Sequence, residues 1–301
     1  MASGLGVSAW PTLVVGPIAL AVEADPFFAP WIDELWAECR VPDADALGTR
    51  EGPARHRLTV RLERCAIPRD GLPRTPAFAA SDGRWVDRSA GWEATLRTGT
   101  EATTLSFGLR EVMPSGPIGD PYRRQWVASA LRVALAMAAP SVGGLLVHGA
   151  ALEGPPGVVF LGASGAGKTT MAARLRPWRL LADDAALVYP LGERSWSVVG
   201  TPAAGRERLA RDLQPARLDA LVHLVPGALL ALAPLADAEA FAALLPRILW
   251  FAPPGDRVLA AAQALIDAVP SRRLASTLAD DVRPLLVSST PRIVEAPEAS
   301  C

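Results

Sequence analysis

The segment VVFLGASGAGKTTMAARL, residues 158–175, constrains the fold of this chain more than any other stretch. It starts with an apolar run of strand length, passes through a loop of small residues and ends with apolar residues at helical spacing. Within it, Gly162 to Thr169 satisfy the pattern G-x-x-x-x-G-K-[ST]. The segment therefore predicts a buried strand that turns through a phosphate-binding loop (P-loop) into a helix of an α/β domain.

The loop residues predict a site for the phosphates of a nucleotide. Glycines let successive backbone N–H groups face inward as a cradle for an anion, and the positive end of the following helix adds to it. We expect Lys168 to reach the β- and γ-phosphates and Thr169 to place its hydroxyl on Mg²⁺, with Thr170 as a weaker helper. The predicted nucleotide-binding residues are Gly162, Ala163, Ser164, Gly165, Ala166, Gly167, Lys168, Thr169 and Thr170.

Lys168 is the single lysine in a chain whose Lys and Arg residues number 30 together. An ordinary basic position in this chain is therefore an arginine, so the lysine indicates a specific chemical need. A compact ammonium on a flexible stem suits a triphosphate held in a tight loop better than a planar guanidinium does. The composition thus supports a functional role for Lys168.

Two adjacent carboxylates, Asp183 and Asp184, follow Lys168 after room for only one short helix and the start of one strand. Motor and transporter ATPases normally place their metal-side aspartate much farther along the chain. The Asn-Lys-x-Asp motif of GTPases needs an asparagine and a second lysine, and this chain has neither. Eukaryotic-type protein kinases are excluded for the same reason, because their motifs also need a second lysine and an asparagine. Two carboxylates beside Mg²⁺ suit phosphoryl transfer, in which positioning and charge neutralisation supply most of the catalysis.

Four segments in order, VHGAALEG, GASGAGKTT, LLADDAALV and VVGTPAAG, resemble the C-terminal domain of HPr kinase/phosphorylase and its shorter HPr-kinase-related relatives. These proteins share a phosphoenolpyruvate-carboxykinase-like fold. The resemblance covers residues 144–205 well, extends more loosely to about 287, and does not cover the N-terminal half. It implies transfer of the γ-phosphoryl group of ATP to a serine hydroxyl of a protein or peptide.

The same resemblance implies roles for individual residues. Lys168 and the loop amides hold the triphosphate, and Thr169 and Asp183 serve the metal. Asp184 is the base that takes the proton of the acceptor hydroxyl, although the roles of the two aspartates are interchangeable on sequence grounds. His148 matches a family histidine one strand earlier, near the transferred phosphoryl group or the aspartate. Residue type alone leaves a structural histidine, and a turn or cap made by the aspartates, as alternatives.

This chain departs from the bifunctional enzymes of that family at two points. Thr170 stands where those enzymes carry an acid, and their later metal-binding glutamate has no clear counterpart in SWSVVGTP. We therefore do not assign the reverse, phosphorylase reaction. We also assign no role to His223, which lies in an apolar run and is expected to be structural.

The rest of the sequence predicts two domains. Residues 1–119 are expected to form a β-rich module for acceptor recognition or assembly, with a helix over 29–40 and an antiparallel meander over 55–110. In the meander, Leu58, Val60 and Leu62 share one face. A helix starting at Asp120 opens the P-loop kinase domain, residues 120–301. Further strands are predicted at 144–154, 157–162, 179–190, 196–200 and 219–225, and helices at 238–250 and 256–268.

Composition excludes several classes of partner and location. The formal net charge is -1 and the charges are spread along the chain, so we expect no nucleic-acid binding. The cysteines have no metal-ligand spacing, which fits a reducing cytoplasm. The apolar run 10–22 has no basic residue before it, and the run 220–236 is interrupted by Pro226 and Pro234. We therefore expect neither a secretion signal nor a membrane span; an oligomer is compatible with the sequence.

The leading hypothesis is an ATP- and Mg²⁺-dependent kinase that acts on a Ser or Thr hydroxyl of a small protein or peptide. Analogy with relatives of this size suggests a ribosomally made precursor peptide as the acceptor. One alternative is a small-metabolite kinase of the same fold. Another is a nucleotide-gated peptide-binding module without transfer activity.

Overall fold

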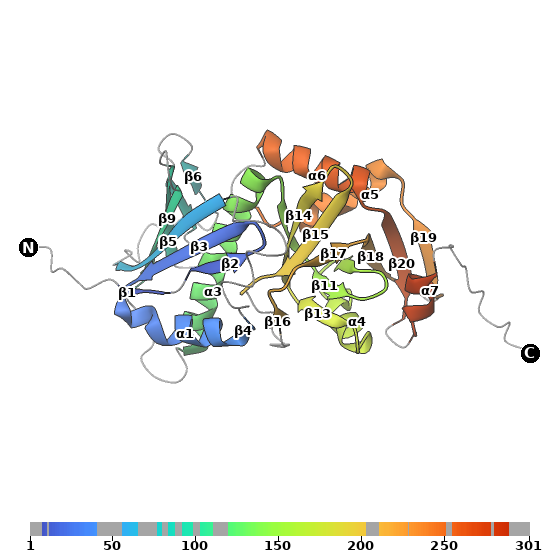
Figure 1. Cartoon of the computed structure of the whole chain (residues 1–301), viewed down its shortest axis with the longest axis horizontal. Helices are drawn as coiled ribbons and strands as arrows, with labels where there is room; N and C mark the ends of the chain where they lie inside the picture. The colour runs from blue at the N-terminus through green and yellow to red at the C-terminus, as the bar shows by residue number, and fades with distance from the viewer. Residues whose placement is uncertain are drawn as a thin grey trace, which may run out of the picture. The chain divides into compact units, whose positions relative to one another are not determined.

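The chain consists of two compact units (Figure 1). Unit 1 comprises Met1–Ala138 and Trp250–Pro253, and unit 2 comprises Ala139–Leu249 and Pro254–Cys301. The structure, a computed structural model, describes residues 8–10, 12–40, 56–65, 77–79, 84–87, 92–98, 103–110, 120–202, 211–227, 229–250, 255–277 and 280–288.

The helix that starts at Asp120 belongs to unit 1. This helix, α3 (Asp120–Ala138), packs against α1 (Ala29–Glu38) and β5 (His56–Cys65). The sequence places the domain boundary before this helix, whereas the structure places the division after it. The reason is that the contacts of α3 with α1 and β5 are tertiary, and the helical pattern alone does not show which core it joins.

Unit 1 contains an eight-stranded sheet among its described residues, in the order β1-β3-β5-β9-β8-β7-β6 with β2 paired to β3. The predicted meander is correct for β6 to β9, whose neighbours are antiparallel, but β5 runs parallel to both β3 and β9. Leu58, Val60 and Leu62, which were predicted to share one face, are all buried. The other elements are β1 (Ser8–Ala9), β2 (Leu13–Val15), β3 (Ile18–Ala24), η1 (Pro26–Phe28), β4 (Cys39–Arg40), β6 (Ala77–Ala79), β7 (Arg84–Asp87), β8 (Trp92–Thr98) and β9 (Thr103–Arg110).

Unit 2 is a mixed α/β domain with two sheets in its described residues. A six-stranded sheet has the order β13-β11-β12-β18-β20-β19, and a four-stranded sheet has the order β10-β14-β15-β17. Its strands are β10 (Leu145–His148), β11 (Ala150–Glu153), β12 (Val158–Leu161), β13 (Arg179–Ala182), β14 (Ala185–Gly192), β15 (Ser195–Gly200), β16 (Arg211–Asp212), β17 (Ala216–Leu218), β18 (Ala220–Pro226), β19 (Ala231–Pro234) and β20 (Ser271–Ser276). Its helices are η2 (Ala139–Val142), α4 (Lys168–Arg174), α5 (Asp237–Leu244), η3 (Leu245–Arg247), α6 (Asp256–Ala268) and α7 (Arg283–Val287).

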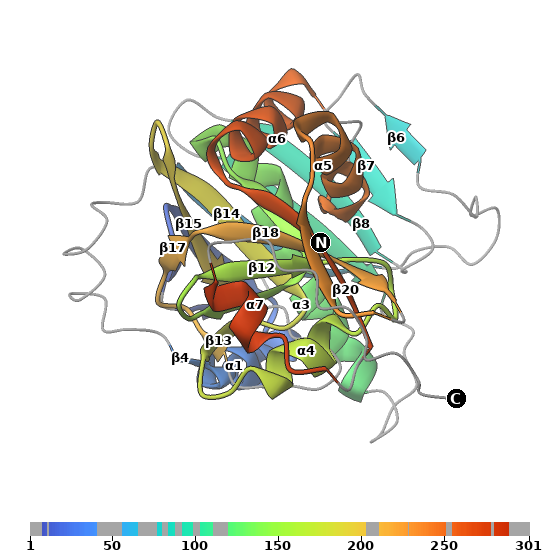
Figure 2. The same cartoon turned by 90° about the vertical axis from the view of Figure 1, so that its right-hand side faces the viewer.

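Helices cover both faces of the six-stranded sheet. Figure 2 shows α5 and α6 on one side of β12 and β18, and α4 and α7 on the other. Side chains of β12 alternate between these two layers, as successive strand residues must. Val159 and Leu161 join the core beneath α5 and α6, whereas Val158 and Phe160 join the core beneath α4 and α7. The loop after β12 therefore leaves a strand that is buried on both faces.

Three predicted elements of unit 2 are interrupted. The predicted strand 144–154 is two strands that break at Gly149, and the predicted strand 179–190 is two strands that break at Asp183 and Asp184. At each break the chain passes from one sheet to the other. The predicted helix 238–250 ends as α5 at Leu244 and continues only as the short η3, because Pro246 cannot continue the α-helical hydrogen bonding.

The run 10–22 forms strands β2 and β3, joined by a turn at Gly16, whose φ is 54°. The run 220–236 forms β18 and β19. Within the part of the chain that the structure describes, no helix has the length and apolar character needed to cross a membrane.

Candidate functional site

The loop between β12 and α4 depends on its glycines. Gly165 and Gly167 have φ values of 79° and 88°, a left-handed backbone that glycine adopts without steric cost. A Cβ on Gly162 would lie 3.0 Å from the Cβ of Ala166 and 3.1 Å from the carbonyl oxygen of Leu224. The loop thus turns tightly against β18. Ala163, Ser164 and Gly165 at its crest are exposed.

Lys168 folds back over this loop. Its Nζ donates hydrogen bonds to the carbonyl oxygens of Gly162 and Ala163, both at 3.1 Å, and the residue is only 7% exposed. Burial lowers the pKa of its ammonium, the positive charge of Arg247 lowers the pKa further, and Asp184 raises it. Among the described residues, no carboxylate forms an ion pair with this Nζ. The charge is therefore placed to meet an anion in the loop.

The short length of α4 decides which groups hold such an anion. Because the helix spans only Lys168–Arg174, its dipole is small, so an anion would depend on the Lys168 ammonium and on loop N–H groups other than that of Ala166, which donates to the carbonyl oxygen of Ala163. This set of donors fits the phosphates of a nucleotide.

His148 and Asp184 lie in direct contact. The Nδ1 of His148 lies 3.0 Å from the Oδ1 of Asp184, with side chains 33% and 20% exposed. The pairing of β10 with β14 causes this contact, because it sets His148 opposite Ala185, the residue after Asp184. The backbone N–H of Gly149 also donates to the carbonyl oxygen of Asp184, at 3.0 Å. The resemblance implied that His148 lies near the transferred phosphoryl group or the aspartate, and in the structure it contacts Asp184.

The neighbouring Asp183 is 4% exposed, and Thr169 is half-buried at the start of α4. Among the described residues, no three His, Cys, Asp or Glu side chains form a group that could hold a metal by themselves. Mg²⁺ beside a P-loop needs only one or two protein oxygens, because phosphates and waters supply the remaining ligands. A hydroxyl and a carboxylate of the Thr169 and Asp183 type fit that requirement. Thr170 is exposed.

His223, to which the sequence assigns no role, lies beside β12. β18 runs parallel to β12, and His223 pairs with Leu161, the last residue before the loop. The ring is 6% exposed, and its Nε2 is buried without a hydrogen-bond partner among the described residues. Burial lowers the pKa of His223 to about 4, and the charges of Arg247 and Arg273 act in the same direction. The ring is therefore neutral near pH 7.

Arg247 is the second residue that the sequence did not reveal. It ends η3 and is half-buried, and its charge acts on both Lys168 and His223. The charge thus lies within electrostatic range of the loop from the side of η3. In a chain so rich in arginine, no local pattern marks this position.

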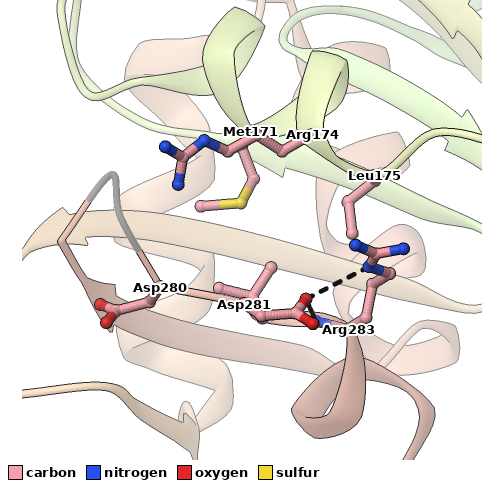
Figure 3. A pocket seen from close by; sticks show the side chains of 7 residues that line it. Met171, Arg174, Leu175, Asp280, Asp281 and Arg283 are labelled. Carbon is pink, nitrogen blue, oxygen red and sulfur yellow. Dashed lines mark hydrogen bonds and ion pairs between the residues drawn. The ribbon is translucent and has the colours of Figure 1, made fainter.

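A pocket lies between α4 and the segment that leads into α7 (Figure 3). This segment follows β20, which runs parallel to β18, so it leaves the sheet at the same carboxyl edge as the P-loop. The Oδ1 of Asp281 accepts hydrogen bonds from the backbone N–H and Nε of Arg283, both at 3.2 Å, and these bonds lower the pKa of Asp281. The lining residues are Met171, Arg174, Leu175, Asp280, Asp281, Val282 and Arg283.

Unit 2 is a mixed α/β domain with a loop that turns at positive-φ glycines, a buried lysine and a His–Asp pair. Residues 126–240 match the model of a protein family described as SynChlorMet cassette protein ScmC. The match covers less than half of the chain. It includes the loop, both aspartates, His148 and His223, and it ends before Arg247. No curated protein matches the chain.

Proposed function

We propose that this protein is an ATP- and Mg²⁺-dependent kinase of the HPr-kinase-like type, acting on a Ser or Thr hydroxyl of a small protein or peptide. The observation that carries the proposal is the His148–Asp184 contact in the same domain as the loop over which the buried Lys168 folds back. A binding module needs the loop alone, whereas a kinase also needs a positioned base. The proposal places the protein in the cytoplasm, where ATP is available.

The loop and Lys168 supply the donors for the triphosphate. When a nucleotide enters, the Lys168 ammonium exchanges two carbonyl acceptors of its own loop for phosphate oxygens. Thr169 and Asp183 are the residues that would hold Mg²⁺, which supplies charge neutralisation to the phosphates. Asp183 is the more buried of the two aspartates, which suits the metal side.

Asp184 takes the role of base. Its contact with Nδ1 of His148 fixes the orientation of the carboxylate, and its partial exposure leaves it accessible to an acceptor. In the transfer step the acceptor O–H bond breaks and its proton moves to the Asp184 carboxylate. The acceptor oxygen bonds to the γ-phosphorus while the bond to the β–γ bridging oxygen breaks, and ADP leaves. His148 is a positioning residue in this scheme.

A peptide is the proposed acceptor class, and a ribosomally made precursor peptide is the specific case that we propose by analogy. The test incubates the full chain with Mg²⁺ and labelled ATP, with Ser-containing peptides in one series and free amino acids or sugars in another. Label in the small molecules alone would support a metabolite kinase. ATP-dependent peptide binding with no gain of mass would support a binding module.

Two substitutions separate catalysis from folding. We expect Lys168→Ala and Asp184→Asn to abolish transfer and to leave the urea unfolding midpoint close to that of the wild type, because both groups serve the ligand. Glu193→Gln, an exposed carboxylate in the turn between β14 and β15, is the matched control and should transfer normally. If both site variants still phosphorylate the peptide, as measured by its intact mass, the result would contradict the mechanism.

A further inference from the structure

We propose that Arg247 is a catalytic residue that contacts the γ-phosphoryl group and neutralises its charge during transfer. This role rests on the proposed kinase function, and Arg247 lies outside the sequence motifs described above. It follows from where the backbone holds Arg247, from the charges that surround it and from the chemistry of the transfer.

The backbone beside Arg247 is fixed to the strand that carries His148. Ile248 forms an antiparallel bridge with Val147, and the N–H of Leu249 donates to the carbonyl oxygen of Leu146 at 2.8 Å. Arg247 directly precedes this bridge as the last residue of η3, and His148 directly follows Val147 as the last residue of β10, so in an antiparallel bridge the two residues leave it at the same end. Arg247 therefore begins from the strand end where His148 contacts Asp184.

This anchor is rigid because it belongs to the core. Ile248 is 6% exposed and packs in the same cluster as Leu145 and Val147. A side chain that extends from a buried bridge starts from a fixed position, which reduces the entropy lost when it binds a ligand. The arrangement is thus suited to hold a guanidinium in place before the substrate arrives.

Two positive groups converge on the loop from different elements. Lys168 lies buried over the loop at the start of α4, and the charge of Arg247 reaches it from η3. Within the described part of the chain, the guanidinium of Arg247 makes no hydrogen bond or ion pair. Two positive charges held close together with little neutralisation by nearby carboxylates repel each other in the free protein. A polyanion bound between them makes the same arrangement favourable.

The chemistry of phosphoryl transfer needs such a group. Negative charge spreads over the γ-phosphoryl oxygens as the bond to the leaving ADP breaks. A planar guanidinium donates in a fixed fork and stays charged, so one arginine can contact two of these oxygens at once. An arginine supplied in this way raises the rate on the order of 10³-fold or more in other phosphoryl-transfer enzymes.

The test compares Arg247→Gln with the wild type in binding and in transfer. ADP with aluminium fluoride and Mg²⁺ mimics the transition state of phosphoryl transfer, whereas ADP alone does not. We expect the variant to keep its affinity for ADP and to lose the tighter binding of the aluminium fluoride complex, both measured by calorimetry. Its kcat should fall by about 10³-fold, with the KM for ATP nearly unchanged. Arg194→Gln, an exposed arginine in the turn after β14, is the control.

The outcomes separate this proposal from the kinase function itself. If the wild type binds neither ADP nor the mimic, both proposals are overturned. If the wild type transfers phosphate and Arg247→Gln binds the mimic equally well, or loses ADP and the mimic by the same factor, only the role of Arg247 is overturned. Arg247→Lys keeps the charge without the fork and provides a second variant should the Gln variant unfold. A full recovery of kcat by lysine would contradict a role based on the guanidinium.

Discussion

At the residue scale, burial of His223 links the site to the stability of unit 2. The folded protein holds the pKa of this ring at about 4, below the ordinary value of 6.5. The unfolded chain binds more protons between these two values, so stability is fully present above about pH 6.5 and is lost as the pH falls toward 4. The neutral ring keeps a polar nitrogen beside β12 at physiological pH.

Replacement of His223 by leucine should remove this acid-sensitive step. From pH 7 to pH 4, the free energy of unfolding of His223→Leu should rise by about 3 kcal/mol relative to that of the wild type, since each pKa unit is worth about 1.4 kcal/mol. Urea unfolding at several pH values measures this change. His56→Gln, which lies on β5 of unit 1, is the matched histidine variant for comparison. Parallel pH curves for His223→Leu and the wild type would contradict the account.

At the element scale, the site depends on two places where the chain crosses between sheets. Gly149 separates β10 from β11, and Asp183 with Asp184 separates β13 from β14. Because both crossings occur side by side, His148 and Asp184 meet there. Apolar residues stand on both sides of Gly149 and of the two aspartates, so the sequence predicted one strand at each place.

Gly149→Ala tests the first crossing. The added Cβ would lie 2.7 Å from the carbonyl oxygen of Phe160 and 3.1 Å from Cγ1 of Val159, so the backbone must shift. We expect a loss of about 1–3 kcal/mol in the free energy of unfolding, together with slower transfer, because the shift moves His148. Gly255→Ala is the control, since its Cβ would meet no atom within 4 Å. Equal urea midpoints for these two variants would refute the steric argument.

At the scale of the whole molecule, every residue of the candidate site belongs to unit 2, from His148 to Arg247. The loop with its flanking strand and helix, and the adjacent aspartates, could be recognised from the sequence because each is a contiguous pattern. His223 and Arg247 could not, because the register of β18 against β12 and the Ile248–Val147 bridge bring them to the loop. No local pattern encodes such pairings. The side on which α3 packs depends on tertiary contacts in the same way.

The central claim is that residues 162–169 of the folded chain hold a nucleoside triphosphate through main-chain amides and the ammonium of Lys168. Calorimetric titration of ATP with Mg²⁺ into the full chain and into Lys168→Ala tests it most directly. We predict saturable binding of one nucleotide per chain by the wild type, and a large loss of affinity in the variant at an unchanged urea midpoint. Absence of binding by the folded wild type, or equal affinity in the two proteins, would contradict the claim.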